Sequence, residues 1–209
     1  ADQSVTVQHG DMSRMPNPRR QSRRLRRPPP ALWFFTDATR VPDTAAAITA
    51  LPAGCGVVLR DYQRPDRAAW AGRMIRLCRR QGRLVLLAGD ARLALALGAD
   101  GVHHPAWALA GGRARRRPKR RWLISAAAHN RAEALRAAAA GVDLVLISPV
   151  FATNSHRGGR SLGPLRLGLL RRQLHPAVVG LGGIGPGNAC RLQGLGLAGY
   201  AAIESLIRQ

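Results

Sequence analysis

The stretch RWLISAAAHNRAEALRAAAAGVDLVLISPVF, residues 121–151, contains the elements that decide the fold. Its two apolar runs, 121–127 and 142–151, are typical of strands, and the segment between them, 129–141, has a helical composition and ends in glycine. The runs are apolar throughout rather than alternating, which is typical of strands that are buried on both faces of a parallel sheet. The stretch therefore predicts a parallel strand–helix–strand unit.

The same alternation extends over most of the chain. Further apolar runs lie at 31–37, 55–61, 83–89, 99–103, 177–183 and just after 198, and helical segments lie at 45–51, 64–82, 91–97, 163–174, 186–196 and up to 209. About eight such units in about 180 residues predict a single α/β domain over 31–209 with the fold of a (β/α)₈ TIM barrel. A doubly wound open sheet is the alternative fold.

Residues 1–30 have a different composition, and we expect them to form a disordered basic tail. Much of the formal net charge of +22 lies in this tail and in a loop at 111–121. Neither segment interleaves aromatic with basic residues, which argues against a nucleic-acid-binding surface. No apolar run approaches the roughly 18 residues of a membrane span, and the first residues lack the apolar region of a secretory signal.

The three cysteines, Cys55, Cys78 and Cys190, are widely spaced and fit neither a disulfide framework nor a zinc pattern. We expect buried, reduced thiols in a cytoplasmic protein. The only lysine, Lys119, lies in the polybasic loop, where nothing predicts the desolvation that Schiff-base chemistry requires. A homodimer is left open.

In either fold, ligands bind at the carboxyl ends of the strands. The residues there are rich in hydroxyls and glycine amides, include one arginine and are poor in carboxylates, which favours an anion site over a catalytic carboxylate pair. They are Thr36, Asp37, Arg60, Asp61, Gly89, Asp90, His103, His104, Ser125, Ser148, Thr153, Ser155, His156, Gly182, Gly183 and residues 203–205.

The stretch VVGLGGIGPGN, residues 178–188, ends an apolar run in closely spaced glycines. Glycine in this density allows close backbone approach or positive φ. TIM barrels frequently bind phosphate on backbone amides after the seventh and eighth strands. Gly182 and Gly183, with the start of the last helix near Glu204, are therefore a candidate phosphate site, and a tight strand-to-helix turn is the alternative.

Seven segments resemble the thiamine phosphate synthase family, which includes thiazole tautomerase relatives. In chain order they are LWFFTD, VVLRD, ALALGADGVH, ISAAAHN, GVDLVLISPVFATNSH, VVGLGGI and AGYAAIESL, and the resemblance covers residues 31–207. It implies a (β/α)₈ barrel in thiamine biosynthesis. It also implies a transferase that joins hydroxymethylpyrimidine diphosphate to thiazole phosphate and releases pyrophosphate, usually with Mg²⁺.

The resemblance also implies roles for individual residues. Arg60 matches an arginine that grips the diphosphate, although Val58 and Tyr62 replace the glutamine and lysine of that Gln-x-Arg-x-Lys motif. Ser125 matches the serine of the fifth strand. Thr153 and Ser155 match a hydroxyl pair that binds diphosphate oxygens, and His156 replaces the lysine that follows them.

Gly182, Gly183, Ile203 and Glu204 match the thiazole-phosphate site, with Glu204 in place of a serine. The family's metal site has an Asn-Asp pair after the third strand and an aspartate soon after GVH. In an ungapped alignment, Ala108 stands in place of the aspartate, and Ala88 and Gly89 stand in place of the pair. Asp90, one residue further on, is the candidate metal ligand, and Mg²⁺ would then be held mostly by the diphosphate itself.

Three functions remain open on these residues. The first is a divergent synthase with a degraded metal site. The second is a thiazole tautomerase-like isomerase, although Pro149 stands where that subgroup carries a histidine. The third is a non-catalytic barrel that binds phosphate or a thiamine precursor.

Overall fold

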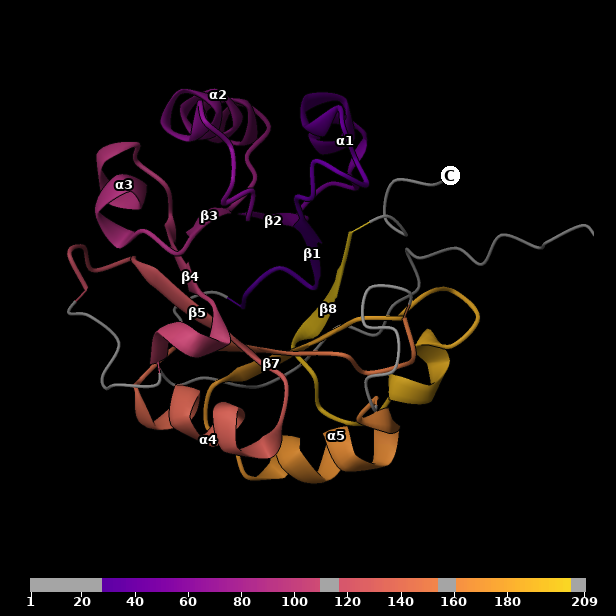
Figure 1. Cartoon of the computed structure of the whole chain (residues 1–209). Helices are drawn as coiled ribbons and strands as arrows, with labels where there is room; N and C mark the ends of the chain where they lie inside the picture. The colour runs from indigo at the N-terminus through magenta and orange to yellow at the C-terminus, as the bar shows by residue number, and fades with distance from the viewer. Residues whose placement is uncertain (1–27, 110–116, 154–160, 204–209) are drawn as a thin grey trace, which may run out of the picture.

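The computed structural model describes residues 28–109, 117–153 and 161–203. Its strands form one closed barrel in chain order, each parallel to its neighbours, and the first strand pairs with the eighth (Figure 1). This confirms the (β/α)₈ prediction and excludes the open sheet. The basic tail up to residue 27 and the helix predicted at the carboxyl terminus lie outside the described residues.

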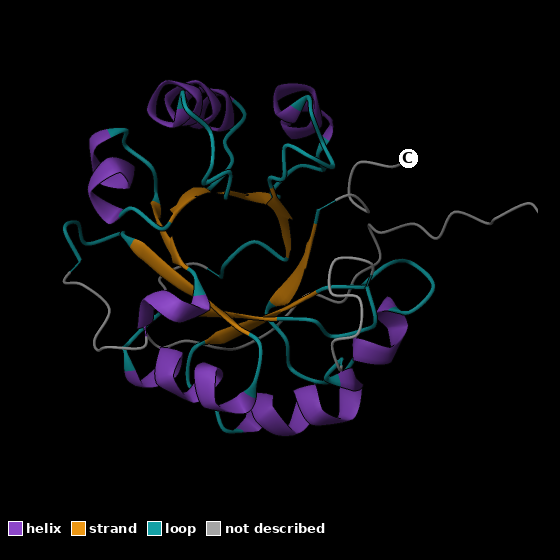
Figure 2. Cartoon of the chain, in the orientation of Figure 1, coloured by secondary structure: helices purple, strands orange, loops and turns teal. Residues whose placement is uncertain are grey.

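The helices surround the ring of strands, as Figure 2 shows. The strands are β1 (Leu32–Phe35), β2 (Gly56–Leu59), β3 (Val85–Ala88), β4 (Gly101–His104), β5 (Leu123–Ala128), β6 (Leu144–Ile147), β7 (Ala177–Leu181) and β8 (Gly199–Ala202). The helices are α1 (Thr44–Ala50), α2 (Arg67–Arg80), α3 (Ala91–Ala96), α4 (Arg131–Ala139) and α5 (Gly163–Arg172), with 3₁₀ helices η2 (Ala106–Leu109) and η4 (Ala189–Leu192).

The helix predicted over 186–196 is wrong in extent, because only the short 3₁₀ helix η4 forms there. Gly194 and Gly196 adopt positive φ of 76° and 72°, a conformation that does not continue a right-handed helix. The other helices follow their sequence signals. Asp90 and Asn130 cap α3 and α4 through side-chain oxygens, and Gly82 follows α2 with φ of 64°, as expected of a glycine that ends a helix.

Alternating strand residues divide the core into two layers. Phe34 packs with helix residues such as Ile48 and Trp70 in the layer between barrel and helices. Trp33 and Phe35 belong instead to a second cluster built almost wholly from strand residues, which fills the barrel interior. The Trp33 indole lies directly against Gly56 on the neighbouring strand, where an added Cβ would be 2.7 Å from the ring.

Charged side chains at the amino-terminal end of the barrel bind backbone groups. The buried Asp143 carboxylate accepts two hydrogen bonds of 2.7 Å from Arg117 and a third, of 2.9 Å, from the Ile124 amide. Arg83 donates to the carbonyls of residues 51 and 52, and Arg171 to those of residues 174 and 196. These contacts tie together the turns that lead into the strands.

The thiols follow the prediction in part. Cys55 and Cys78 are buried, and burial raises their pKa values to about 11 and about 12. The prediction is wrong for Cys190, which is exposed because η4 is a short surface turn rather than a packed helix. Within the described residues, no helix is long and apolar enough to cross a membrane.

Candidate active site at the barrel mouth

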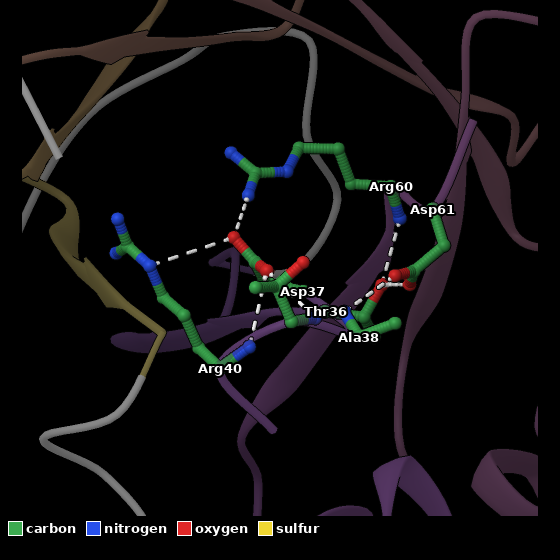
Figure 3. Close-up of polar contacts among 7 residues, drawn as sticks. Thr36, Asp37, Ala38, Arg40, Arg60 and Asp61 are labelled. Atoms are coloured by element: carbon green, nitrogen blue, oxygen red, sulfur yellow. Dashed lines mark hydrogen bonds and ion pairs between the residues drawn. The ribbon is translucent and has the colours of Figure 1, made fainter. Parts of the chain in front are cut away.

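Arg60 and Asp37 form an ion pair at the carboxyl ends of β2 and β1. Arg60 directly follows β2, and its Nη2 donates to Oδ2 of Asp37 over 2.8 Å. The Arg40 Nε lies 3.7 Å from the same oxygen. Figure 3 shows the two guanidinium groups directed at this one oxygen of the Asp37 carboxylate. Sequence reasoning identified Arg60 as a site residue but gave no role to its carboxylate partner or to Arg40.

The carboxylate of Asp61 fixes the backbone on which this ion pair is built. Asp61 accepts a hydrogen bond from the Thr36 hydroxyl and another, of 2.7 Å, from the Ala38 amide. The Thr36 Oγ1 in turn accepts from the Arg60 amide at 2.9 Å. The loops after β1 and β2 are thereby joined, which fixes the point from which the Arg60 side chain leaves the barrel (Figure 3).

A pocket of about 440 Å³ opens between these two loops. Its lining includes the charged residues Asp37, Asp61, Arg60 and Arg64. Arg64 pairs with Asp66 at 3.0 Å and lies over the Trp70 ring. Arg60 is 35% exposed and Asp37 is 17% exposed, so the pair lies at the edge of solvent, where a charged ligand could reach it.

Ser125 and His103 form a hydrogen-bonded pair inside the barrel. Ser125 is fully buried in the middle of β5, so the expectation that it ends its strand is wrong, because β5 continues to Ala128. Its Oγ lies 2.9 Å from Nδ1 of His103. Burial, with smaller effects of His104 and Arg60, lowers the pKa of His103 to about 3, so the ring is neutral at pH 7. This agrees with a structural rather than a catalytic histidine.

Gly182 and Gly183 turn the chain sharply after β7, with φ of 93° and 67°. A Cβ on Gly183 would lie 2.5 Å from the carbonyl oxygen of Ala152, and one on Gly182 would lie 3.0 Å from Cα of Pro149. The fold alone therefore requires both glycines. Within the described residues, neither amide N–H has an acceptor. The turn is thus also compatible with phosphate binding.

The other predicted site residues are only partly described. Thr153 lies in the loop after β6, and Ile203 follows β8 and packs against the interior cluster. Ser155, His156 and Glu204 lie outside the described residues. The predicted roles of all these side chains stay predictions.

The proposed metal ligand Asp90 has a structural partner. Its Oδ1 accepts hydrogen bonds of 2.9 Å from the amides of Arg92 and Leu93, which caps α3. Among the residues that the structure describes, no group of three or more histidine, cysteine or acidic side chains could hold a metal ion. The carbonyl of Ala88, at the end of β3, accepts from the guanidinium of Arg67. A guanidinium beside a single carboxylate does not fit the oxygen-rich, anionic ligand set of Mg²⁺.

The closed barrel and the charged groups at its mouth define a (β/α)₈ protein with a candidate ligand site at the carboxyl ends of the strands. Comparison with known proteins then gives the family. The model of the thiamine monophosphate synthase family matches residues 32–206, and the chain belongs to this family.

Curated relatives agree with this assignment. A thiamine-phosphate synthase of Methanoculleus marisnigri is 35% identical over 84% of this chain and 87% of its own length. The bifunctional protein ThiM/ThiE of Symbiobacterium thermophilum is 34% identical over 85% of this chain, which spans only 37% of that protein. The solved thiamine phosphate pyrophosphorylase of Pyrococcus furiosus superposes with a TM-score of 0.69 at 23% identity, over 86% of this chain and 88% of that one, and it supports the fold alone.

Proposed function

We propose that this chain joins hydroxymethylpyrimidine diphosphate to thiazole phosphate, giving thiamine phosphate and pyrophosphate. The observation that carries the proposal is Arg60. It matches the diphosphate-binding arginine of the family that the chain belongs to, and Asp37 holds it at the edge of the barrel mouth. Thiamine biosynthesis would place the chain in the cytoplasm.

The chemistry needs stabilisation of a leaving group more than a base. The bond between the pyrimidine methylene carbon and the diphosphate oxygen breaks, and its electron pair leaves with the diphosphate. The thiazole nitrogen then forms a bond to the resonance-stabilised methyl cation. Asp37 accepts from only one nitrogen of Arg60, and a guanidinium has five N–H donors. The remaining donors are available to the departing oxyanion, the kind of electrostatic stabilisation that lowers such barriers.

The second substrate would bind across the mouth from Arg60. Support for this comes from the exposed turn at Gly182 and Gly183, whose amides have no acceptor within the described part of the chain. Ile203 and Glu204 would complete this phosphate site, and Thr153, Ser155 and His156 would contact the diphosphate. The role that the resemblance implies for Ser125 would require substrate binding to expose this side chain, which is fully buried beside His103. Mg²⁺, where it takes part, would enter with the diphosphate and neutralise part of its charge.

The test is a reconstitution with purified chain, both phosphorylated substrates and MgCl₂. Thiamine phosphate and pyrophosphate are expected in equal amounts. The Arg60→Ala variant should lose this activity, whereas Arg73→Ala, which removes an exposed arginine from α2, should keep it. No product at substrate concentrations where calorimetry shows both ligands bound would contradict the proposal and leave a binding barrel. Aromatisation of a thiazole tautomer without condensation would instead identify the isomerase.

A further inference from the structure

Arg67, Tyr62 and the end of β3 form one cluster, which we call the Arg67 cluster. Arg67 is the first residue of α2, and its Nη2 donates to the Ala88 carbonyl across 2.5 Å. Its guanidinium carbon lies 5.4 Å from the centre of the Tyr62 ring. The same ring lies against Gly89, where an added Cβ would be 3.0 Å from Cε1 of Tyr62. The cluster therefore fills the rim of the mouth between β2 and β3.

Two cations act on the phenol of this cluster. Burial raises the pKa of Tyr62, and the charges of Arg60 and Arg67 both oppose that rise. Arg60 lies two residues before Tyr62 and carries the ion pair with Asp37. Of the three Arg67 nitrogens, only Nη2 has an acceptor among the described residues, and Nε is buried without one. The rim thus holds two positive charges near one aromatic ring, and Nη1 of Arg67 has no acceptor among the described residues.

The residues here do not fit the metal that the family resemblance implies. Ala88 and Gly89 have no carboxylate, and Oδ1 of Asp90 caps α3. The Ala88 carbonyl, which could otherwise offer an oxygen to Mg²⁺, already accepts from a guanidinium. A fixed cation at this point repels a divalent ion and attracts the anion that the ion would have accompanied.

We propose that Arg67, together with Arg60, binds a diphosphate group directly, so that the chain needs no protein-bound divalent cation to hold it. Tyr62 stands where the family motif has a lysine, and its ring packs against Arg67 and Gly89 beside the proposed diphosphate position. The identity of the diphosphate as the pyrimidine substrate rests on the proposed function. The binding of a diphosphate by the rim does not.

The test is calorimetric titration with inorganic pyrophosphate, once in EDTA and once in MgCl₂. Unmodified chain in EDTA should bind pyrophosphate within about threefold of its affinity in MgCl₂. The Arg67→Gln variant keeps a donor for the Ala88 carbonyl but loses the charge. It should bind about tenfold more weakly, the loss typical of one charge-assisted hydrogen bond. Arg73→Gln, on the same helix and 53% exposed, is the matched control and should bind as the unmodified chain does.

Two results would each overturn the proposal. One is pyrophosphate binding by the unmodified chain that disappears in EDTA, a measurement that depends on no variant. The other is a folded Arg67→Gln chain, judged by circular dichroism, that binds as tightly as Arg73→Gln. Both readouts are independent of turnover, so a chain that makes no thiamine phosphate would refute the proposed function and leave this inference to be judged on binding alone.

Discussion

The two ends of the barrel use charge in opposite ways. At the amino-terminal end, Asp143 is 1% exposed, and its carboxylate is occupied by Arg117 and a backbone amide. At the mouth, Arg60 is 35% exposed and shares a single nitrogen with Asp37. The two arginines are similarly exposed, because the Arg117 side chain is 32% exposed, so the ends differ in the aspartate and in the hydrogen bonds. Arg117 donates through two nitrogens to the buried Asp143 carboxylate and also to the Trp122 carbonyl, whereas Arg60 donates through one nitrogen to Asp37, which is 17% exposed. The number of hydrogen bonds that each arginine already makes, more than its burial, separates the structural pair from the candidate binding pair.

The largest expected effect on stability comes from a substitution at the amino-terminal end of the barrel. Asp143→Ala removes the acceptor of the buried Ile124 amide and two hydrogen bonds of Arg117, which is 32% exposed and keeps the Trp122 carbonyl. The expected loss is about 2–3 kcal/mol of unfolding free energy. Denaturant titration measures this. The control is Asp66→Ala, which removes the 44% exposed partner of Arg64 and should cost less than about 1 kcal/mol. Equal losses in the two variants would refute the contrast between the ends.

The next largest effect is expected at the barrel mouth and concerns activity. Arg60→Ala should lower kcat/KM for thiamine phosphate formation about a hundredfold, as expected for loss of one preorganised donor to a developing oxyanion. The unfolding free energy should change by less than about 1 kcal/mol, because the pair with Asp37 is partly exposed. Steady-state kinetics and denaturant titration on the same preparation test both halves. A variant that unfolds more easily but keeps its kcat/KM would reverse the assignment.

A smaller effect lies between the ends, at His103. Its pKa is about 3 in the folded chain against an ordinary value of 6.5, so protonation favours the unfolded state. The contribution of neutral His103 to the unfolding free energy is fully present above pH 6.5 and is lost as the pH drops toward 3. At pH 5 the loss is about 2 kcal/mol. Unfolding free energies of the unmodified chain and of His103→Gln between pH 7 and 4.5 test this. The variant should lose that part of the slope, and parallel curves would contradict it.

The last prediction compares the reactivity of cysteines in different parts of the barrel and involves no change in stability. Cys55 and Cys78 lie near the amino-terminal end, and burial raises their pKa values to about 11 and about 12, whereas Cys190 is exposed beyond the turn after β7. A maleimide at pH 7 should therefore modify one of the three thiols in folded chain and all three in denaturant. Mass spectrometry gives the count, and Cys190→Ser should abolish native labelling. Rapid modification of a second thiol would show that the amino-terminal end opens.

The sequence predicted the fold well because the evidence for it is local. Runs such as 142–151 are apolar on both faces, which suits strands that lie between a filled barrel and its helices. The position of Arg60 at the carboxyl end of β2 followed from the same pattern, since this residue directly follows such a run, whereas its role in binding stays a prediction. The prediction of a helix over 186–196 was wrong because it relied on composition and did not account for Gly194 and Gly196. Both adopt a positive φ, which ends the turn.

The contacts of the site were harder to predict, because they join residues far apart in the chain. Nothing in the sequence indicates that Arg67 reaches the Ala88 carbonyl 21 residues later, or that Asp37 pairs with Arg60 23 residues later. Ser125 was misplaced because the strand boundary after it lies within a run of alanines that suits a strand and a helix equally. Burial and side-chain direction depend on the closed barrel, and only the three-dimensional structure supplies them.

The Trp33 indole on β1 occupies the space that a side chain at Gly56 on β2 would need. Any methyl group added at position 56 meets the indole at 2.7 Å, so the two positions should tolerate change together and not separately. A smaller residue at 33 would make room for alanine at 56, so the added methyl group should cost less in that background than in the unmodified chain. An engineer who wishes to widen the interior of this barrel for a bulkier ring would begin with these two residues.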